Sequence, residues 1–207
     1  SMCRQNHKHV PDFECLKRII TDHDPEIIIH MAAQSVVRYS YENPVETYSS
    51  NVMGTVNLLE AVRETEGPRV VVVVTTDKCY ENMEWIWGYR ENDALGGRDP
   101  YASSKACAEL VTYAFRNSFF RPVDFNSHKI AVASARAGNV LGGGDWTRDQ
   151  LVPDIMKAFI EGKPVLIRRP NAIRPWQFVL DTLNGYLTLA ENLCSNAEHY
   201  SEGFNFG

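Results

Sequence analysis

Long apolar runs are missing from this sequence of 207 residues. No stretch approaches the ~20 consecutive apolar residues that a membrane-spanning helix needs, and the first residues lack the charged-then-apolar pattern of a secretory signal. Lys and Arg number 21 against 26 Asp and Glu, so the clustered positive charge that binds nucleic acids and anionic membranes is absent too. We therefore expect a soluble, cytoplasmic protein with neither a nucleic-acid nor a membrane partner.

Cysteine is scarce and follows no disulfide or metal-binding pattern. The five cysteines are widely spaced and never form a CxxC pair: Cys3, Cys15, Cys79, Cys107 and Cys194. An odd number at irregular spacing is typical of neither a disulfide framework nor a zinc site. We expect reduced thiols and no bound metal.

Short apolar runs predict the strands of a sheet. Residues 26–33 and 69–76 are rich in Ile and Val without polar alternation, and residues 129–136 form a weaker run. Such runs predict strands buried on both faces, as in a parallel sheet. Apolar spacings of three and four predict helices over 12–21, 44–63 and 101–115. The alternation predicts a doubly wound α/β sheet made of right-handed βαβ units.

The sequence changes in character after residue 141. Three consecutive glycines at 142–144 predict a flexible loop. Beyond it the patterns predict two helices and a short strand, over 151–161, 181–193 and 164–169 respectively. We therefore divide the chain into an α/β core, residues 1–141, and a smaller region, residues 142–207.

Tyr101 and Lys105 form a YxxxK pair at the start of a predicted helix. Four residues apart, their side chains leave the same face of the helix, one turn from each other. A nearby ammonium favours the phenolate, so we expect Lys105 to lower the pKa of Tyr101 from its usual ~10. Tyr101 then becomes a candidate base for a sugar hydroxyl. Taken alone, the pair also fits an ordinary solvated helix face.

Polar residues follow the valine-rich strand. Thr75, Thr76, Asp77 and Lys78 lie where that strand ends, and ligands of open α/β sheets bind at the carboxyl ends of strands. These side chains could reach the same substrate as Tyr101. The alternative is a strand end capped by polar turn residues.

Several motifs together resemble one family. Residues 75–82, TTDKCYEN, and 88–105, GYRENDALGGRDPYASSK, resemble the extended short-chain dehydrogenases/reductases that dehydrate nucleotide sugars. So do HMAAQS (30–35), NVMGTVNLLEA (51–61), ARAGNVLGGGDW (135–146) and RPWQFVLD (174–181). The resemblance is strongest to the group that acts on CDP-glucose. It implies an NAD-dependent lyase with a Rossmann-like parallel sheet and part of a small lobe for the nucleotide-sugar substrate.

The resemblance also implies catalytic roles. Tyr101 would take the proton of the sugar C4 hydroxyl, Lys105 would hold the nicotinamide ribose, and Thr76 would bind the C4 oxygen. Asp77 would protonate the departing C6 hydroxyl, and Lys78 would take the C5 proton. Related dehydratases have a glutamate in place of Lys78. A lysine acts as a base only when neutral, so its pKa must fall well below ~10.4.

Binding residues are implied as well. The NAD-binding set comprises Ala32, Ala33, Gln34, Asn51 and Thr75, together with Tyr101 and Lys105. The substrate-binding set comprises Gln34, Asn139 and Arg174, and a guanidinium suits a diphosphate by charge and geometry. Simpler interpretations exist, with Asn139 as a turn residue and Arg174 as a surface charge. Two positions depart from the family pattern, Gln150 in place of an arginine and Arg169 in place of a small polar residue.

One feature of the family is missing. Its members hold the NAD pyrophosphate on a GxxGxxG turn after their first strand, whereas the first glycine here is Gly54. The resemblance therefore implies a chain shortened at both ends that lacks the first strands of the sheet. The strand at 26–33 then becomes an exposed sheet edge, which invites pairing with another chain. We expect a homo-oligomer, or an edge that the N-terminal segment covers.

Three functions remain open. The first is an NAD-dependent dehydratase that converts CDP-glucose to its 4-keto-6-deoxy form. The second is a catalytically impaired relative that binds nucleotide sugars or serves as a subunit of an assembly. The third is a nucleotide-sugar epimerase, which Lys78 and the GGGDW loop disfavour because an epimerase needs no acid and base for dehydration.

Overall fold

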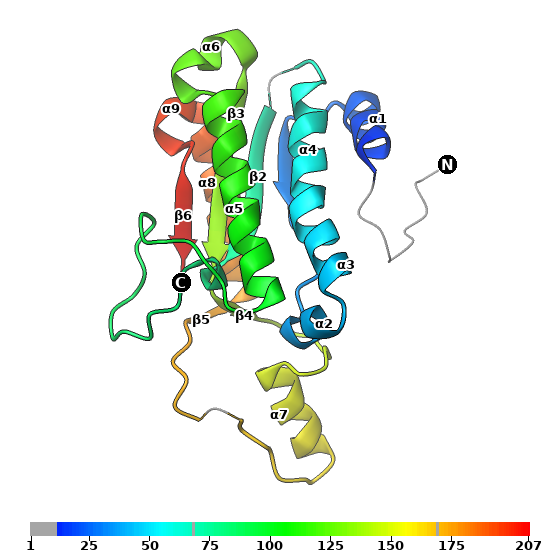
Figure 1. Cartoon of the computed structure of the whole chain (residues 1–207), viewed down its shortest axis with the longest axis vertical. Coiled ribbons are helices and arrows are strands. Elements are labelled where there is room, and N and C mark those ends of the chain that lie inside the picture. Colours follow the sequence, from blue (N-terminus) through cyan, green and yellow to red (C-terminus); the bar gives the residue numbers. More distant parts are fainter. Residues whose placement is uncertain (1–11, 68, 169) are drawn as a thin grey trace.

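The computed structural model describes residues 12–67, 69–168 and 170–207. Its centre is a four-stranded parallel sheet with the order β1–β2–β3–β6 (Figure 1). The strands are Ile27–His30, Arg69–Thr76, Ile130–Ala137 and Gly203–Phe206. The parallel sheet and three of its strands are confirmed, whereas β6 was not predicted.

Strand β2 is central because its residues are apolar on both faces. It pairs in parallel with β1 on one side and β3 on the other, so that Val72 lies opposite Ile29 and Ala133. Strand β1 pairs only with β2 within the described chain, and Ile27 is 44% exposed. Within the described residues β1 is therefore a sheet edge, as the sequence predicts.

Three long helices cover one face of the sheet: α1 (Phe13–His23), α4 (Gly54–Arg63) and α5 (Pro100–Ser118) (Figure 1). Leu59 and Val62 of α4 pack with Val71 and Val73 of β2 in one apolar cluster. Short elements lead into α4, namely α2 (Val37–Glu42), α3 (Pro44–Tyr48) and a π-helix, η1 (Ser49–Met53). The helix predicted over 44–63 is therefore confirmed, with a π-turn in its middle.

The opposite face is covered by α8 (Val179–Ser195) and α9 (Ala197–Tyr200). Leu189 and Leu193 of α8 pack with Val70, Val72 and the alanines of β3. Both α8 and β6 come after residue 142, yet α8 packs on the main sheet and β6 is one of its strands. The division of function at residue 142 stays a prediction, and only part of the second region lies outside the core.

That outlying part contains α7 (Leu151–Ile160) and β5 (Trp176–Phe178), and β5 pairs in parallel with β4 (Asn139–Leu141), which comes from the end of the first region. Helix α7 lies beyond the carboxyl end of the main sheet (Figure 1). Asp149, just before α7, forms ion pairs with Arg38 and Arg168, each at 3.2 Å. The strand predicted over 164–169 is wrong, because 164–168 have no strand partner for their backbone groups and Leu166 is 83% exposed. Arg169 lies outside the described residues.

Short helical turns complete the described elements: η2 (Asp77–Cys79), η3 (Pro122–Asp124) and α6 (Phe125–His128). Helix α5 begins at Pro100 because Asp99 caps it, accepting a 2.9 Å hydrogen bond from the backbone N–H of Ala102. A Cβ atom at Gly97 would lie 2.3 Å from the backbone nitrogen of Ser103. Only glycine lets the loop before α5 approach the helix so closely.

The expectation of reduced thiols is wrong for one cysteine. Cys15 is disulfide-bonded, whereas Cys79, Cys107 and Cys194 are free. The irregular spacing argued against a framework of several bridges, but it could not exclude a single one. Cys3 and the N-terminal segment expected to cover the sheet edge lie outside the described residues.

No described helix is both long and apolar enough to cross a membrane. Within the same residues, no group of three or more His, Cys, Asp or Glu side chains is placed to hold a metal ion.

Candidate active site

The polar triplet Thr76, Asp77 and Lys78 forms a compact turn where β2 ends. The Thr76 hydroxyl accepts a hydrogen bond from the backbone N–H of Lys78 at 3.4 Å and donates one to Asp77 Oδ1 at 3.0 Å. Lys78 Nζ lies 3.4 Å from the same Asp77 oxygen and donates to Oδ1 of Asn139 at 3.2 Å. Asn139 is the first residue of β4, so the structure brings it to the triplet from 61 residues away.

Tyr101 and Lys105 reach the same place from α5. Their exposed fractions are 8% and 7%. The side chain of Tyr101 lies beside that of Thr76, and Lys105 Nζ donates to the carbonyl of Val74 at 3.1 Å. All five predicted catalytic residues therefore lie together at the carboxyl end of β2.

The predicted effect of Lys105 on Tyr101 is wrong in this structure. Burial raises the pKa of Tyr101 to about 12, despite the opposing effect of the Thr76 side chain beside it. Burial also lowers the pKa of Lys105 to about 8, against the negative charge of Glu109, which raises it. Desolvation thus disfavours both charged forms. The sequence argument weighed the neighbouring charge and had no measure of burial.

The loop after β1 is fixed by Asn51. The amide nitrogen of Asn51 donates to Gln34 O at 3.0 Å and to the Ser104 hydroxyl at 2.8 Å, while its oxygen accepts from the backbone N–H of Gln34 at 2.8 Å. Gln34 Nε2 also donates to Thr47 Oγ1 at 2.9 Å. Asn51 is only 2% exposed. It therefore ties residues 31–36 to helix α5.

The other four predicted binding residues lie in different surroundings from one another. Ala32 and Ala33 carry minimal side chains in the loop after β1 and are exposed and half-buried. The Thr75 hydroxyl is buried and donates to Glu109 of α5, on the face of the sheet that α5 covers. Arg174 is exposed and donates to the carbonyl of its neighbour Ile173 at 3.0 Å, apart from the catalytic hydrogen bonds. Their binding roles stay predictions.

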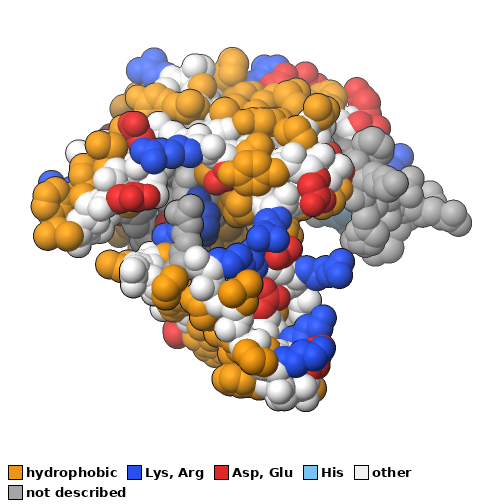
Figure 2. Space-filling model, turned by 60° about the horizontal axis from the view of Figure 1, so that its bottom comes forward, with side chains coloured by type: hydrophobic (Ala, Val, Ile, Leu, Met, Phe, Trp, Pro, Cys, Tyr) orange, Lys and Arg blue, Asp and Glu red, His pale blue; other side chains and the backbone are white. Residues whose placement is uncertain are grey.

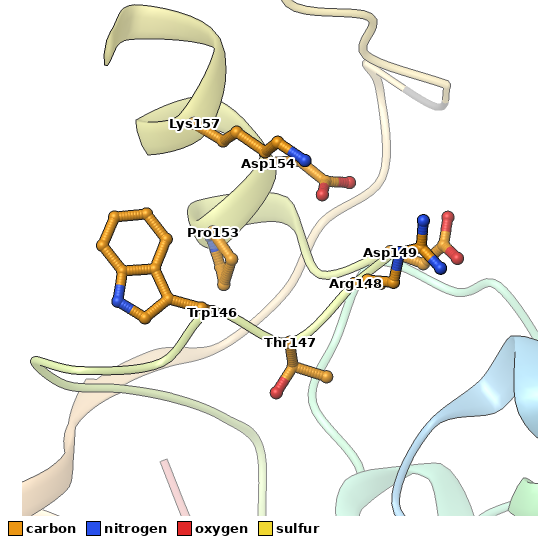
Figure 3. Close-up of a pocket in the computed structure, with 7 residues that line it drawn as sticks. All are labelled: Trp146, Thr147, Arg148, Asp149, Pro153, Asp154 and Lys157. Carbon is orange, nitrogen blue, oxygen red and sulfur yellow. The ribbon is translucent and has the colours of Figure 1, made fainter. Parts of the chain in front are cut away.

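Two adjoining cavities of about 280 and 310 Å³ lie beside α7 and share Trp146 and Pro153. The smaller is polar, with Trp146 on one side and Arg148 and Asp149 on the other (Figure 3). The larger reaches Val140 and Leu141 of β4, directly after Asn139. Lys and Arg side chains gather on this side of the molecule (Figure 2). An anionic ligand that extended from the catalytic turn toward α7 would meet these cations, and it would also meet Asp149 and Asp154, which line the same cavity.

A buried charged network behind the catalytic residues was not predicted. Arg136 of β3 donates to Glu109 of α5 at 2.8 Å and to the Tyr80 hydroxyl at 2.7 Å. Tyr80 donates in turn to Asn205 of β6 at 2.7 Å. The signals were in the sequence, because Glu109 follows Lys105 by four residues and Arg136 interrupts an apolar strand.

His30 was also passed over as a site residue. It ends β1, and its Nε2 lies 3.3 Å from the Thr55 hydroxyl. Burial, assisted by the positive charge of Lys105, lowers the pKa of His30 to about 4. The ring is therefore neutral at physiological pH.

Similarity to known proteins agrees with this site. A family model described as GDP-mannose 4,6 dehydratase matches residues 5–201. The chain belongs to this family. It is 56% identical over 198 residues to a CDP-glucose 4,6-dehydratase of Salmonella typhimurium, covering 96% of this chain and 55% of that protein. It is also 26% identical over 195 residues to a UDP-glucose 4-epimerase of Mycoplasma pneumoniae, covering 89% and 56%.

Solved structures of the family's relatives share the fold. DesIV, a dTDP-glucose 4,6-dehydratase of Streptomyces venezuelae with NAD and TYD bound, has a TM-score of 0.80 at 25% identity, covering 97% of this chain and 57% of that one. A UDP-glucose 4-epimerase of Thermotoga maritima has a TM-score of 0.79 at 23% identity, covering 96% and 60%, and shows the fold alone. The Rossmann-like class is confirmed. The chain spans about half the length of the curated relatives it matches.

Proposed function

We propose that this chain supplies the catalytic centre of an NAD-dependent nucleotide-sugar 4,6-dehydratase that acts on CDP-glucose. The observation that carries the proposal is the meeting of Tyr101 and Lys105 with the Thr76–Asp77–Lys78 turn at the carboxyl end of β2. The 56% identity to a CDP-glucose 4,6-dehydratase supports the choice of substrate.

The residues on one side of the site suit the nicotinamide end of NAD. Ala32 and Ala33 leave room for the cofactor to approach the backbone of the loop after β1, and Asn51 holds that loop in place. Lys105, held at the end of β2, would bind the ribose. NAD bound there would supply hydride acceptance from C4 of the sugar and hydride return to C6.

The protein's own groups would move the protons. Tyr101 would take the proton of the C4 hydroxyl, and Thr76, which lies beside Tyr101, would bind the same oxygen. Asp77 would protonate the departing C6 hydroxyl, while Lys78 would remove the C5 proton. Asp77 and Lys78 are adjacent and share a contact of 3.4 Å. The elimination across the C5–C6 bond would require the proton of that contact to lie on Asp77, which leaves Lys78 neutral as the base and Asp77 protonated as the acid.

Burial of Tyr101 sets a condition on this chemistry. With a pKa of about 12, Tyr101 is protonated at neutral pH in this state. It becomes a better base when a positive charge comes close, because opposite charge favours the phenolate. The Lys105 ammonium, four residues further along α5, is a candidate as long as it stays protonated, which requires a pH below its pKa of about 8.

Isotope transfer tests the function. The full chain is incubated with NAD⁺ and CDP-glucose that carries deuterium at C4. The dehydratase proposal predicts a 4-keto product with the deuterium at C6, whereas an epimerase would return it to C4. Tyr101→Phe should lower kcat about 10²- to 10⁴-fold, because it removes a general base. Absence of any product, while NAD⁺ and CDP-glucose still raise the melting temperature, would favour the impaired binder.

A further inference from the structure

Helix α5 presents three buried polar residues along one stripe. Tyr101, Lys105 and Glu109 are spaced by four, so they lie on one face over successive turns. Each is less than 9% exposed. The first two are the proposed catalytic residues, whereas Glu109 lies one turn further from the substrate side.

Each residue of the stripe contacts a residue at the end of β2. Tyr101 lies beside Thr76, and Lys105 donates to the carbonyl of Val74 at 3.1 Å. Between these two, the Thr75 hydroxyl donates to Oε1 of Glu109. Three successive turns of the helix thus contact three consecutive residues of one strand.

The Glu109 carboxylate is itself held from the neighbouring strand. Its Oε2 accepts hydrogen bonds from Arg136 Nη2 and from the Ser134 hydroxyl, both at 2.8 Å. Arg136 is fixed in turn by the carbonyl of Glu91 at 2.8 Å. Oxygen Oε2 is therefore occupied by β3, which leaves Oε1 directed at Thr75. A buried carboxylate needs such partners, because burial without them disfavours its charge.

We propose that Thr75 and Glu109 are positioning residues. Their hydrogen bond fixes the position of α5 along strand β2, and with it the positions of Tyr101 and Lys105. Apolar packing holds a helix against a sheet, whereas directional bonds such as this one also set its position along the strand. An error of about 1 Å in the placement of a reacting group costs on the order of 10²-fold in rate. The roles of Tyr101 and Lys105 in this inference rest on the proposed function, whereas the placement of Lys105 does not.

The test compares two matched substitutions in the full chain. Thr75→Val removes the bonding hydroxyl with little change of shape. Thr112→Val makes the same change in α5, where the buried hydroxyl donates only to Ala108 O at 2.8 Å within its own helix. Thr75→Ser restores the hydroxyl. Each change should lower the melting temperature by only about 2–4 °C.

The first readout needs neither substrate nor NAD. Trace acetylation followed by peptide mass spectrometry measures how fast the Lys105 amine reacts. We expect Thr75→Val to raise that rate at least threefold, while Thr112→Val and Thr75→Ser stay within twofold of the parent chain. Equal rates in Thr75→Val and the parent, or no reaction of Lys105 in either, would overturn the inference.

The second readout is turnover of CDP-glucose. Thr75→Val should lower kcat tenfold or more with KM within twofold, and Thr75→Ser should recover most of the loss. An unchanged kcat in Thr75→Val contradicts the inference. A parent chain that binds CDP-glucose but does not convert it contradicts the proposed function instead. The acetylation rates of Lys105 then decide by themselves whether Thr75 and Glu109 are positioning residues.

Discussion

The ammonium of Lys78 lies 3.2 Å from Oδ1 of Asn139 and 3.4 Å from Oδ1 of Asp77. Asn139 begins β4 directly after β3 ends at Ala137. The contact therefore connects the catalytic turn after β2 to the small sheet that leads toward α7. Lys78 is held between a carboxylate and an amide, with one third of its side chain still exposed (33%).

Removing the amide should affect catalysis more than stability. In Asn139→Ala, Lys78 keeps only its contact with Asp77, and we expect kcat to fall about tenfold, equivalent to about 1–2 kcal/mol for one charged hydrogen bond. The free energy of unfolding should change by less than about 1 kcal/mol, because Asn139 is only half-buried. Asn117→Ala, at the exposed far end of α5, is the control. Equal kcat values in the two variants would contradict the role of Asn139.

The half-buried ring of His30 should make stability depend on pH. Its folded pKa is about 4, whereas an unfolded histidine titrates near ~6.5. Between these values the unfolded chain binds a proton that the folded chain does not, so the free energy of unfolding falls as the pH drops. The expected His30 contribution is a loss of about 2 kcal/mol between pH 7 and pH 5.

Urea denaturation of variants at both pH values isolates the His30 contribution. His30→Asn should remove about 2 kcal/mol from the change in the free energy of unfolding between pH 7 and pH 5. His23→Asn should leave it unchanged, because His23 is exposed at the end of α1. The same loss of stability in the parent chain and in His30→Asn would rule out His30 as its source.

The predictable parts of the fold are those with a local signal. The run of valines from Val70 to Val74 can be buried on both sides only in the middle of a parallel sheet, and β2 lies there. Strand β6 has four residues, and strands β4 and β5 have three each. Their identity as strands depends on the partners Asn139, Trp176 and Phe204 find in space, which periodicity does not reveal.

The sequence predicted which five residues meet at the carboxyl end of β2, but it did not predict their electrostatics. Tyr101 and Lys105 are visible in the sequence as a spaced pair, whereas the pKa of each is set mainly by burial. Burial depends on the packing of α5 against β2. The hydrogen bonds that join Thr75, Glu109 and Arg136 were not predicted for a related reason. They connect three elements that meet only in the folded chain.

The apolar layer under α4 should dominate stability. Leu59 is fully buried (0% exposed) against β2, so Leu59→Ala should cost about 2–5 kcal/mol by leaving a cavity. Leu110→Ala in α5 makes the same change where the side chain is 55% exposed, and should cost less than about 0.5 kcal/mol beyond any change in helix propensity. Urea denaturation measures both. A similar loss in the two variants would contradict the assigned core.

The edge formed by β1 should make the chain self-associate. Within the described residues β1 has one neighbour, so its outer backbone groups are open to another strand, and Ile27 adds a 44% exposed apolar side chain. Ile27→Lys places a charge on that edge and should shift sedimentation velocity profiles toward the monomer. Ile160→Lys removes a 70% exposed isoleucine on α7, away from the edge, and should leave association unchanged. A parent chain that stays monomeric at every concentration would show that the edge does not drive pairing.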